Sequence, residues 1–145
     1  MEDAEAFIRQ TLREGIVYYY RSDTLTGSAE PHFYVVLSCN DEELILLVCA
    51  TSNIERRKRI REANDWPSET LVIVSPKEAP FLDQESAFDC NFVQNESIRS
   101  LARIHSRKPI VIKGQASVEL LRRLKVGVLK SSQIVKKVQD ILRKL

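Results

Sequence analysis

The chain has 145 residues, a formal net charge of +2 and an ordinary share of hydrophobic residues, 43%. This length suits one domain whose core needs no disulfide bonds, and we expect a single domain over residues 1–145. No apolar run approaches the ~20 residues of a membrane span, and the N-terminus lacks the apolar segment of a signal peptide, so we expect a cytoplasmic protein with no membrane partner.

Charge is distributed unevenly along the chain. From Arg99 onward there are 13 Lys and Arg residues against two acidic residues, whereas the preceding part carries nine basic and 18 acidic residues. This asymmetry has three explanations, which the sequence leaves open. The basic part binds an anionic partner, or it covers the outer faces of amphipathic helices, or it faces the acidic part in a homodimer.

The first elements in chain order are a short helix over Ala4–Arg13, within an N-terminal helical segment 1–14, and a strand over Ile16–Arg21. The segment Ser22–Pro31 is rich in Ser, Thr, Gly and Pro and has no apolar period, so it predicts a loop. Long polar loops in compact domains are often functional, and this one is a candidate to cover a substrate.

Two apolar runs, Phe33–Leu37 and Leu44–Cys49, then flank an acidic turn signal. Their β-branched and aromatic residues favour strands, and the short polar break predicts an antiparallel hairpin. In such a hairpin the start of one strand lies beside the end of the next. We therefore expect His32, which precedes the first run, to meet Thr51 and Ser52, which follow the second.

The segment Asn53–Asp65 carries five basic residues and few apolar ones, so any helix here is mostly solvated. It either steers phosphates or is a charged connector. Thr70–Ser75 and Ser86–Val93 are expected to be strands. Period two in the second of these places Asp89 and Asn91 on the face opposite the phenylalanines, which is either solvent or the floor of a site.

The rest of the chain predicts a short helix in Glu96–Arg107, a strand over Pro109–Lys113 and C-terminal helices over 117–145. Strands at regular spacing followed by helices indicate an α+β fold that is mainly β, a small curled antiparallel sheet or barrel over 15–113. The three cysteines are odd in number and lack metal-ligand spacing, so we expect reduced thiols and neither a metal nor a cofactor.

At this point the chain resembles the MazF/PemK-type toxins, the RNA-cleaving partners of type II toxin–antitoxin modules. The motifs that carry the resemblance are Gly15-Ile16-Val17, Pro31–Ser38, Leu44–Ser52, Ser86–Val93 and Lys113–Leu121. The resemblance implies an SH3-like barrel with terminal helices, a homodimer, and an antitoxin with an acidic tail as partner. It also implies sequence-specific, metal-independent cleavage of single-stranded RNA by attack of the ribose 2′-OH on its own phosphate.

The resemblance assigns roles to individual residues. The family's second strand usually opens with Arg-Pro, where this chain has His32 and Phe33. Histidine titrates near pH ~6.5, so His32 is the candidate acid, base or phosphate clamp, or else it only caps the strand edge. Thr51 matches the family's active-site hydroxyl, or else it only bonds the backbone. The candidate substrate-binding residues are Arg21, Ser22, Ser52, Arg56, Asp89 and Asn91.

Two further hypotheses compete with an endoribonuclease. The missing Arg-Pro pair favours a non-catalytic barrel that binds nucleic acid or a protein partner. The basic surface also suits a pure protein-interaction module that holds an acidic peptide. Salt-dependent nucleic-acid binding without turnover distinguishes the first of these from the second.

Overall fold

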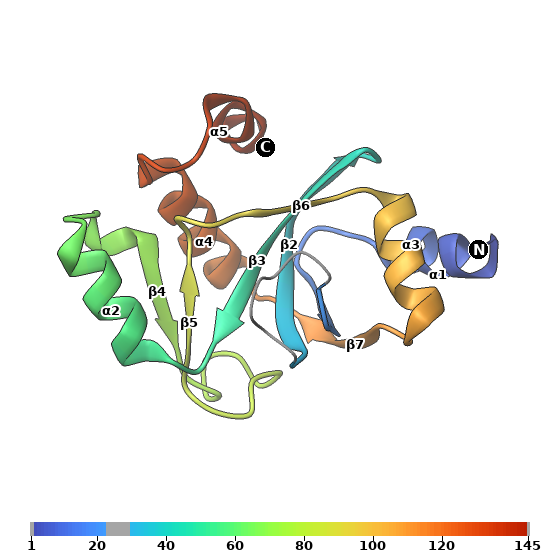
Figure 1. Ribbon diagram of the computed structural model, residues 1–145, viewed down its shortest axis with the longest axis horizontal. Helices are drawn as coiled ribbons and strands as arrows, with labels where there is room; N and C mark the ends of the chain where they lie inside the picture. Colours follow the sequence, from blue (N-terminus) through green and yellow to red (C-terminus); the bar gives the residue numbers. More distant parts are fainter. Residues whose placement is uncertain (1, 23–29, 145) are drawn as a thin grey trace.

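The computed structural model describes residues 2–22 and 30–144 and shows an α+β fold, as expected (Figure 1). The strands are β1 (Ile16–Tyr20), β2 (His32–Asp41), β3 (Leu44–Thr51), β4 (Leu71–Val74), β5 (Ser86–Asp89), β6 (Gln94–Glu96) and β7 (Val111–Gln115). The helices are α1 (Glu2–Thr11), α2 (Ile54–Ala63), α3 (Ile98–Arg107), α4 (Val118–Lys130) and α5 (Lys136–Arg143), and the short 3₁₀ helix η1 (Ser68–Thr70) precedes β4. Within the described ranges, no helix is both long enough and apolar enough to cross a membrane.

All of the strand pairs are antiparallel, in the order β4-β5-β3-β2-β1-β7, with β6 paired to β3 as a side branch. The two strands at the ends of this order, β4 and β7, do not pair with each other within the described residues. The antiparallel sheet that we expected is therefore present, but it is open rather than closed into a barrel.

Strand β3 is shared between two ladders. Its first part pairs with β2 and β6, and its last two residues, Ala50 and Thr51, pair with Phe88 and Ala87 of β5. The register with β2 ends at Tyr34 and Cys49. Beyond that pair the two strands part, because β2 continues beside β1 while β3 continues beside β5.

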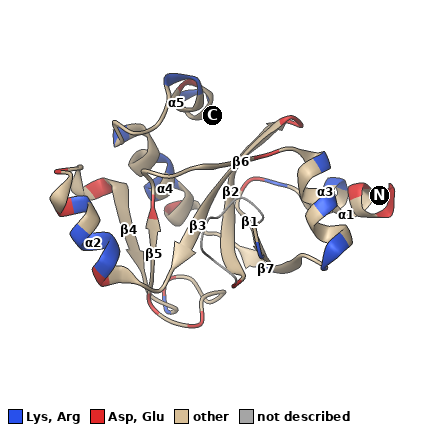
Figure 2. Cartoon of the chain, in the orientation of Figure 1, with Lys and Arg blue, Asp and Glu red and all other residues tan. Residues whose placement is uncertain are grey.

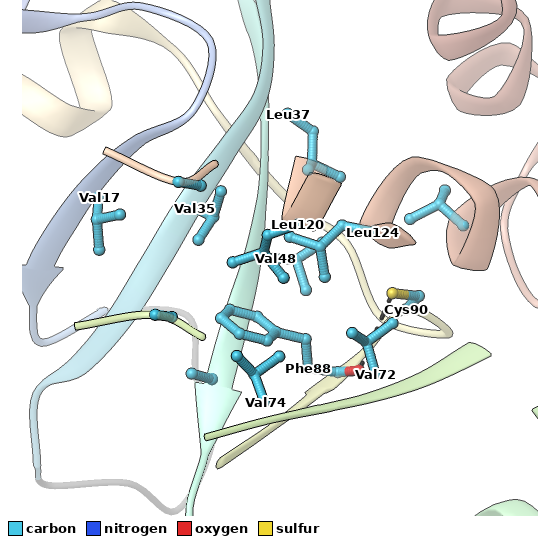
Figure 3. Close-up of a cluster of buried hydrophobic side chains, with 14 of the residues drawn as sticks. Val17, Val35, Leu37, Val48, Val72, Val74, Phe88, Cys90, Leu120 and Leu124 are labelled. Atoms are coloured by element: carbon cyan, nitrogen blue, oxygen red, sulfur yellow. Dashed lines mark hydrogen bonds between the residues drawn. The ribbon is translucent and has the colours of Figure 1, made fainter. Parts of the chain in front are cut away.

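Side chains alternate across the strands, and both faces of the sheet are buried. One face of β1–β3 packs with β4, β5, α4 and α5 around Phe88, whose ring lies between Val48, Val74 and Leu120 (Figure 3). The opposite face packs with α1 and α3, as Figure 1 also shows. Two helical layers thus cover one sheet, which explains why the runs in β2 and β3 are almost continuously apolar.

Three sequence expectations need correction. The strand expected over Ser86–Val93 ends at Asp89, the chain turns, and β6 follows. In this turn the Phe92 side chain is 54% exposed, whereas Asn91 is only 3% exposed. Neither residue therefore lies on the face that period two predicts. In the C-terminal region the low helix propensity of glycine predicts an interruption at Gly127, and Ser131 or Ser132 is the expected cap of the final helix. Instead, α4 runs past Gly127 and α5 begins only at Lys136.

Gly127 lies where α4 crosses η1. A Cβ added there would lie 2.7 Å from the Glu69 carbonyl oxygen and 2.8 Å from the Cys90 Sγ. Alanine normally stabilises a helix by about 0.5–1 kcal/mol relative to glycine, whereas overpacking costs about 1–3 kcal/mol. We expect Gly127→Ala to lower the free energy of unfolding, as measured by urea denaturation. An unchanged or higher value would contradict this close approach.

Candidate functional site

His32 and Thr51 lie at the same end of the sheet, at the start of β2 and the end of β3 (Figure 1). His32 pairs with Tyr20 of β1, and Thr51 pairs with Ala87 of β5. No hydrogen bond joins the two side chains, because β2 and β3 part after Tyr34 and Cys49. The structure therefore brings the two predicted residues to one edge without placing them in direct contact.

Thr51 shapes the start of α2. Its Oγ1 accepts a hydrogen bond of 3.2 Å from the backbone N–H of Asn53, as the backbone-bonded interpretation expected. The Asn53 side chain makes no capping hydrogen bond to α2, and the N–H of Ile54 donates to the Ser52 carbonyl oxygen at 2.9 Å. A helix N-terminus attracts anions, and Thr51 retains a hydroxyl proton to donate beside it.

His32 is half-buried and faces the same side of the sheet as Tyr34. Its Nδ1 and the Tyr20 hydroxyl are both buried, and neither has a hydrogen-bond partner within residues 2–22 and 30–144. Burial is the main cause that raises the pKa of Tyr20 well above its usual value, and the charge of Glu96 adds to it. Buried polar atoms without a hydrogen bond cost stability, and folded proteins retain them mainly where they serve a function. Their presence at His32 therefore supports a functional site at this end of the sheet.

Tyr34 and Cys49 form the last pair of the β2–β3 ladder, next along these strands from His32 and Thr51. The Tyr34 ring stacks on that of Tyr20, with centroids 4.3 Å apart. Burial raises the pKa of the Cys49 thiol to about 11, although the neighbouring Tyr34 hydroxyl and the charge of Arg57 oppose the rise. Burial likewise raises the pKa of Tyr34. Cys49 is therefore a neutral thiol at physiological pH rather than a nucleophile.

Helix α2 carries the basic residues at this end of the molecule (Figure 2). None of its residues is buried, which confirms that it is mostly solvated. Arg56 and Arg59 are exposed and pair with no carboxylate in the described part of the chain. Arg57 differs from them, because its Nη1 lies 3.6 Å from the Asp89 Oδ2.

Asp89 and Asn91 form a buried network instead of lining an open surface. Asn91 Nδ2 donates to Thr70 Oγ1 at 3.0 Å and to Asp89 Oδ1 at 2.9 Å. Its Oδ1 accepts from Ser131 Oγ at 2.6 Å. These bonds tie β5 to η1 and to the end of α4, so both residues support the site rather than present groups to a substrate.

The remaining predicted site residues are scattered around the same edge. Arg21 follows β1 and is exposed, Ser52 follows Thr51 and is exposed, and Ser22 is buried. Most of the loop expected to cover a substrate, residues 23–29, lies outside the described residues. Sequence reasoning missed Tyr20, the cross-strand neighbour of His32, because the strand that carries it was not paired with β2 in that reasoning.

No protein-family model matches the chain, and no curated protein matches its sequence. Within the described ranges, no three His, Cys, Asp or Glu side chains gather in a way that would hold a metal ion. The function must therefore be argued from the arrangement of the residues.

We expect Asn91→Ala to destabilise the fold, because it leaves the hydroxyls of Thr70 and Ser131 without their buried partner. Each lost or orphaned group costs about 1–3 kcal/mol, so a fall of about 2–4 kcal/mol in the free energy of unfolding is expected. Urea denaturation measures this value, and the exposed Asn95→Ala change is the control. A loss below about 0.5 kcal/mol would show that Asn91 is not the centre of this network.

The buried thiols and phenols predict that stability falls at alkaline pH. The unfolded chain releases the Cys49 proton near the ordinary thiol pKa of 9.0, whereas the folded chain holds it until about 11. Stabilisation is therefore complete below pH 9 and is lost as the pH rises toward 11, at up to about 1.4 kcal/mol per pH unit for each such group. Urea denaturation from pH 7.5 to 10.5 should show this decline, and Cys49→Ala should make it shallower. Identical slopes would argue against a buried thiol.

Proposed function

We propose that the chain is a metal-independent endoribonuclease that cleaves single-stranded RNA, as its resemblance to the MazF/PemK-type toxins implies. One observation carries the proposal. Thr51 ends β3 at the uncapped N-terminus of the basic helix α2, at the edge of the sheet where β2 begins with His32. An imidazole can transfer the protons of phosphodiester cleavage, and a hydroxyl and a helix N-terminus can bind the phosphate.

The proposed roles combine this arrangement with what the resemblance implies. Thr51 and the first turn of α2 bind the scissile phosphate, and the exposed guanidinium of Arg56 adds to the attraction. His32 accepts the proton of the 2′-OH as that oxygen attacks phosphorus, or it donates a proton to the departing 5′ oxygen, while water supplies the other transfer. The products are a 2′,3′-cyclic phosphate and a 5′-OH. The open antiparallel sheet takes the place of the SH3-like barrel of the family.

The wider toxin hypothesis belongs to the same proposal. A homodimer and an antitoxin with an acidic tail are the partners that the resemblance implies. The exposed cations Arg56 and Arg59 of α2 suit an acidic peptide as well as RNA. Such a peptide would act as an inhibitor by competing with RNA for α2. The Lys and Arg residues of α3 lie at the opposite end of the molecule (Figure 2).

A second candidate function is RNA binding without cleavage. It is favoured by the divergence of β2 and β3, which separates His32 from Thr51, and by the burial of the His32 Nδ1. In this case the same edge binds phosphate but no group transfers the proton.

The decisive experiment incubates the purified protein with mixed-sequence single-stranded RNA in EDTA. We expect fragments that end in a cyclic phosphate. His32→Ala should slow cleavage by about 10²–10⁴-fold, the usual contribution of a positioned acid or base, and Thr51→Ala by about 10²–10³-fold, the usual cost of one lost donor to the developing charge. The matched controls are Ser132→Ala and Arg103→Ala, which change exposed residues on other elements. Undiminished cleavage by His32→Ala would remove its role, and salt-dependent binding with no cleavage would select the second candidate.

A further inference from the structure

We propose that Phe92, together with Trp66 and Arg57, forms a stacking site for one unpaired base of a single-stranded RNA that runs along α2. The inference takes the RNA partner from the proposed function and adds a base-binding subsite to it. Phe92 is 54% exposed, which is unusual for a phenylalanine, and it lies in the turn between β5 and β6.

Three groups that recognise bases come together there. The Trp66 ring meets the Phe92 ring edge-on, with centroids 6.1 Å apart. The Arg57 guanidinium carbon lies 5.6 Å from the centroid of the Phe92 ring. Proteins that bind single-stranded nucleic acid combine exposed aromatic rings, on which bases stack, with arginines and a basic surface that follows the phosphates.

Hydrogen bonds fix the backbone that carries both rings. Asp65 adopts φ +53°, a left-handed conformation that turns the chain back at the end of α2. Trp66 is then fixed by hydrogen bonds in both directions with Arg61, since its N–H donates to the Arg61 carbonyl and its carbonyl accepts from Arg61 Nη1 at 3.0 Å. The Phe92 N–H donates to the Asp89 carbonyl and closes the turn above the buried Asn91 network. A backbone that is already ordered loses less conformational entropy when RNA binds to the two rings.

The stacking site and the proposed phosphate site lie at opposite ends of α2, because Thr51 precedes its first turn and Trp66 follows Ala63, about 15 Å along the helix. Thr51 pairs with Ala87 on β5, and Asp89, two residues further along that strand, contacts Arg57. The unpaired cations Arg56 and Arg59 lie on the same helix as Arg57. An RNA strand that binds at the N-terminus of α2 and follows the helix would bring a later base to Phe92. Two rings beside a cationic helix fit a nucleobase and its phosphates better than a protein partner, which would require a wider apolar surface.

Trp66 is the only tryptophan of the chain, so its fluorescence reports on this stacking site. We would titrate the full chain with a 12-nucleotide single-stranded RNA of mixed sequence whose riboses carry 2′-O-methyl groups, so that no 2′-OH can attack. We expect a saturable change in Trp66 emission. Phe92→Ala and Phe92→Leu should weaken binding by about 5- to 150-fold, the usual effect of one stacked base, whereas Phe92→Tyr should bind like the parent.

The controls separate stacking from charge and from folding. Val135→Ala removes an apolar side chain that is 66% exposed on another part of the chain and should leave affinity unchanged. Arg59→Ala should reduce the salt dependence of binding, whereas Phe92→Leu should leave that dependence unchanged. Because Phe92→Leu retains an apolar side chain at an exposed position, its melting temperature should match that of the parent.

The results distinguish this inference from the proposed function. Equal affinity of the parent and Phe92→Ala, or no binding of the RNA by the parent, would overturn the stacking site. Phe92-dependent binding, with unmodified RNA left intact in EDTA, would support the stacking site and overturn the endoribonuclease. If unmodified RNA is cleaved, Phe92→Leu should raise KM and leave kcat nearly unchanged.

Discussion

The structure depends on one strand, β3, that is hydrogen-bonded to different partners along its length. Its first part is paired on both sides, with β2 and β6, and its last two residues pair with β5. Because backbone groups in a buried sheet must be paired, the arrival of β5 determines where β2 and β3 part. The same change of partner brings α2 to the edge that carries His32 and Thr51. The fold and the candidate site therefore share one structural cause.

Local patterns predicted the elements whose partners are close in sequence. The hairpin of β2 and β3 and the helix α4 follow from apolar periodicity, a short polar break and the N-cap Ser117, whose side chain accepts from Leu120 N–H. The antiparallel sheet and the α+β class followed from the spacing of these elements. Closure into a barrel was not predictable, because it depends on whether β4 and β7 meet, and no local pattern records a contact across the whole fold.

The turn after β5 shows why the rest failed. Period two predicted Asn91 on an open face, but its amide is held by Thr70 and Ser131, which lie 21 and 40 residues away in the chain. Because these bonds satisfy the Asn91 amide, this polar side chain can be buried in the core, which hydrophobicity alone does not predict. Phe92 is consequently turned outward. Hairpin geometry predicted that His32 and Thr51 lie at the same end of the sheet. It did not predict that the two residues are separated, because β2 and β3 part before they reach them.

The position of β1 has a consequence for how the protein is made. The helix α1 packs against α3, and β1 pairs with β7, which ends at Gln115. During translation residues 2–20 therefore emerge before α3 and β7 have been synthesised. Ile8 and Tyr18 share their cluster with residues of β2 and β3 as well as of α3, so their burial on the nascent chain stays incomplete during this interval. Apolar surface that is exposed for a time in this way is what chaperones protect. Closing so long a loop late also favours slow completion of the fold.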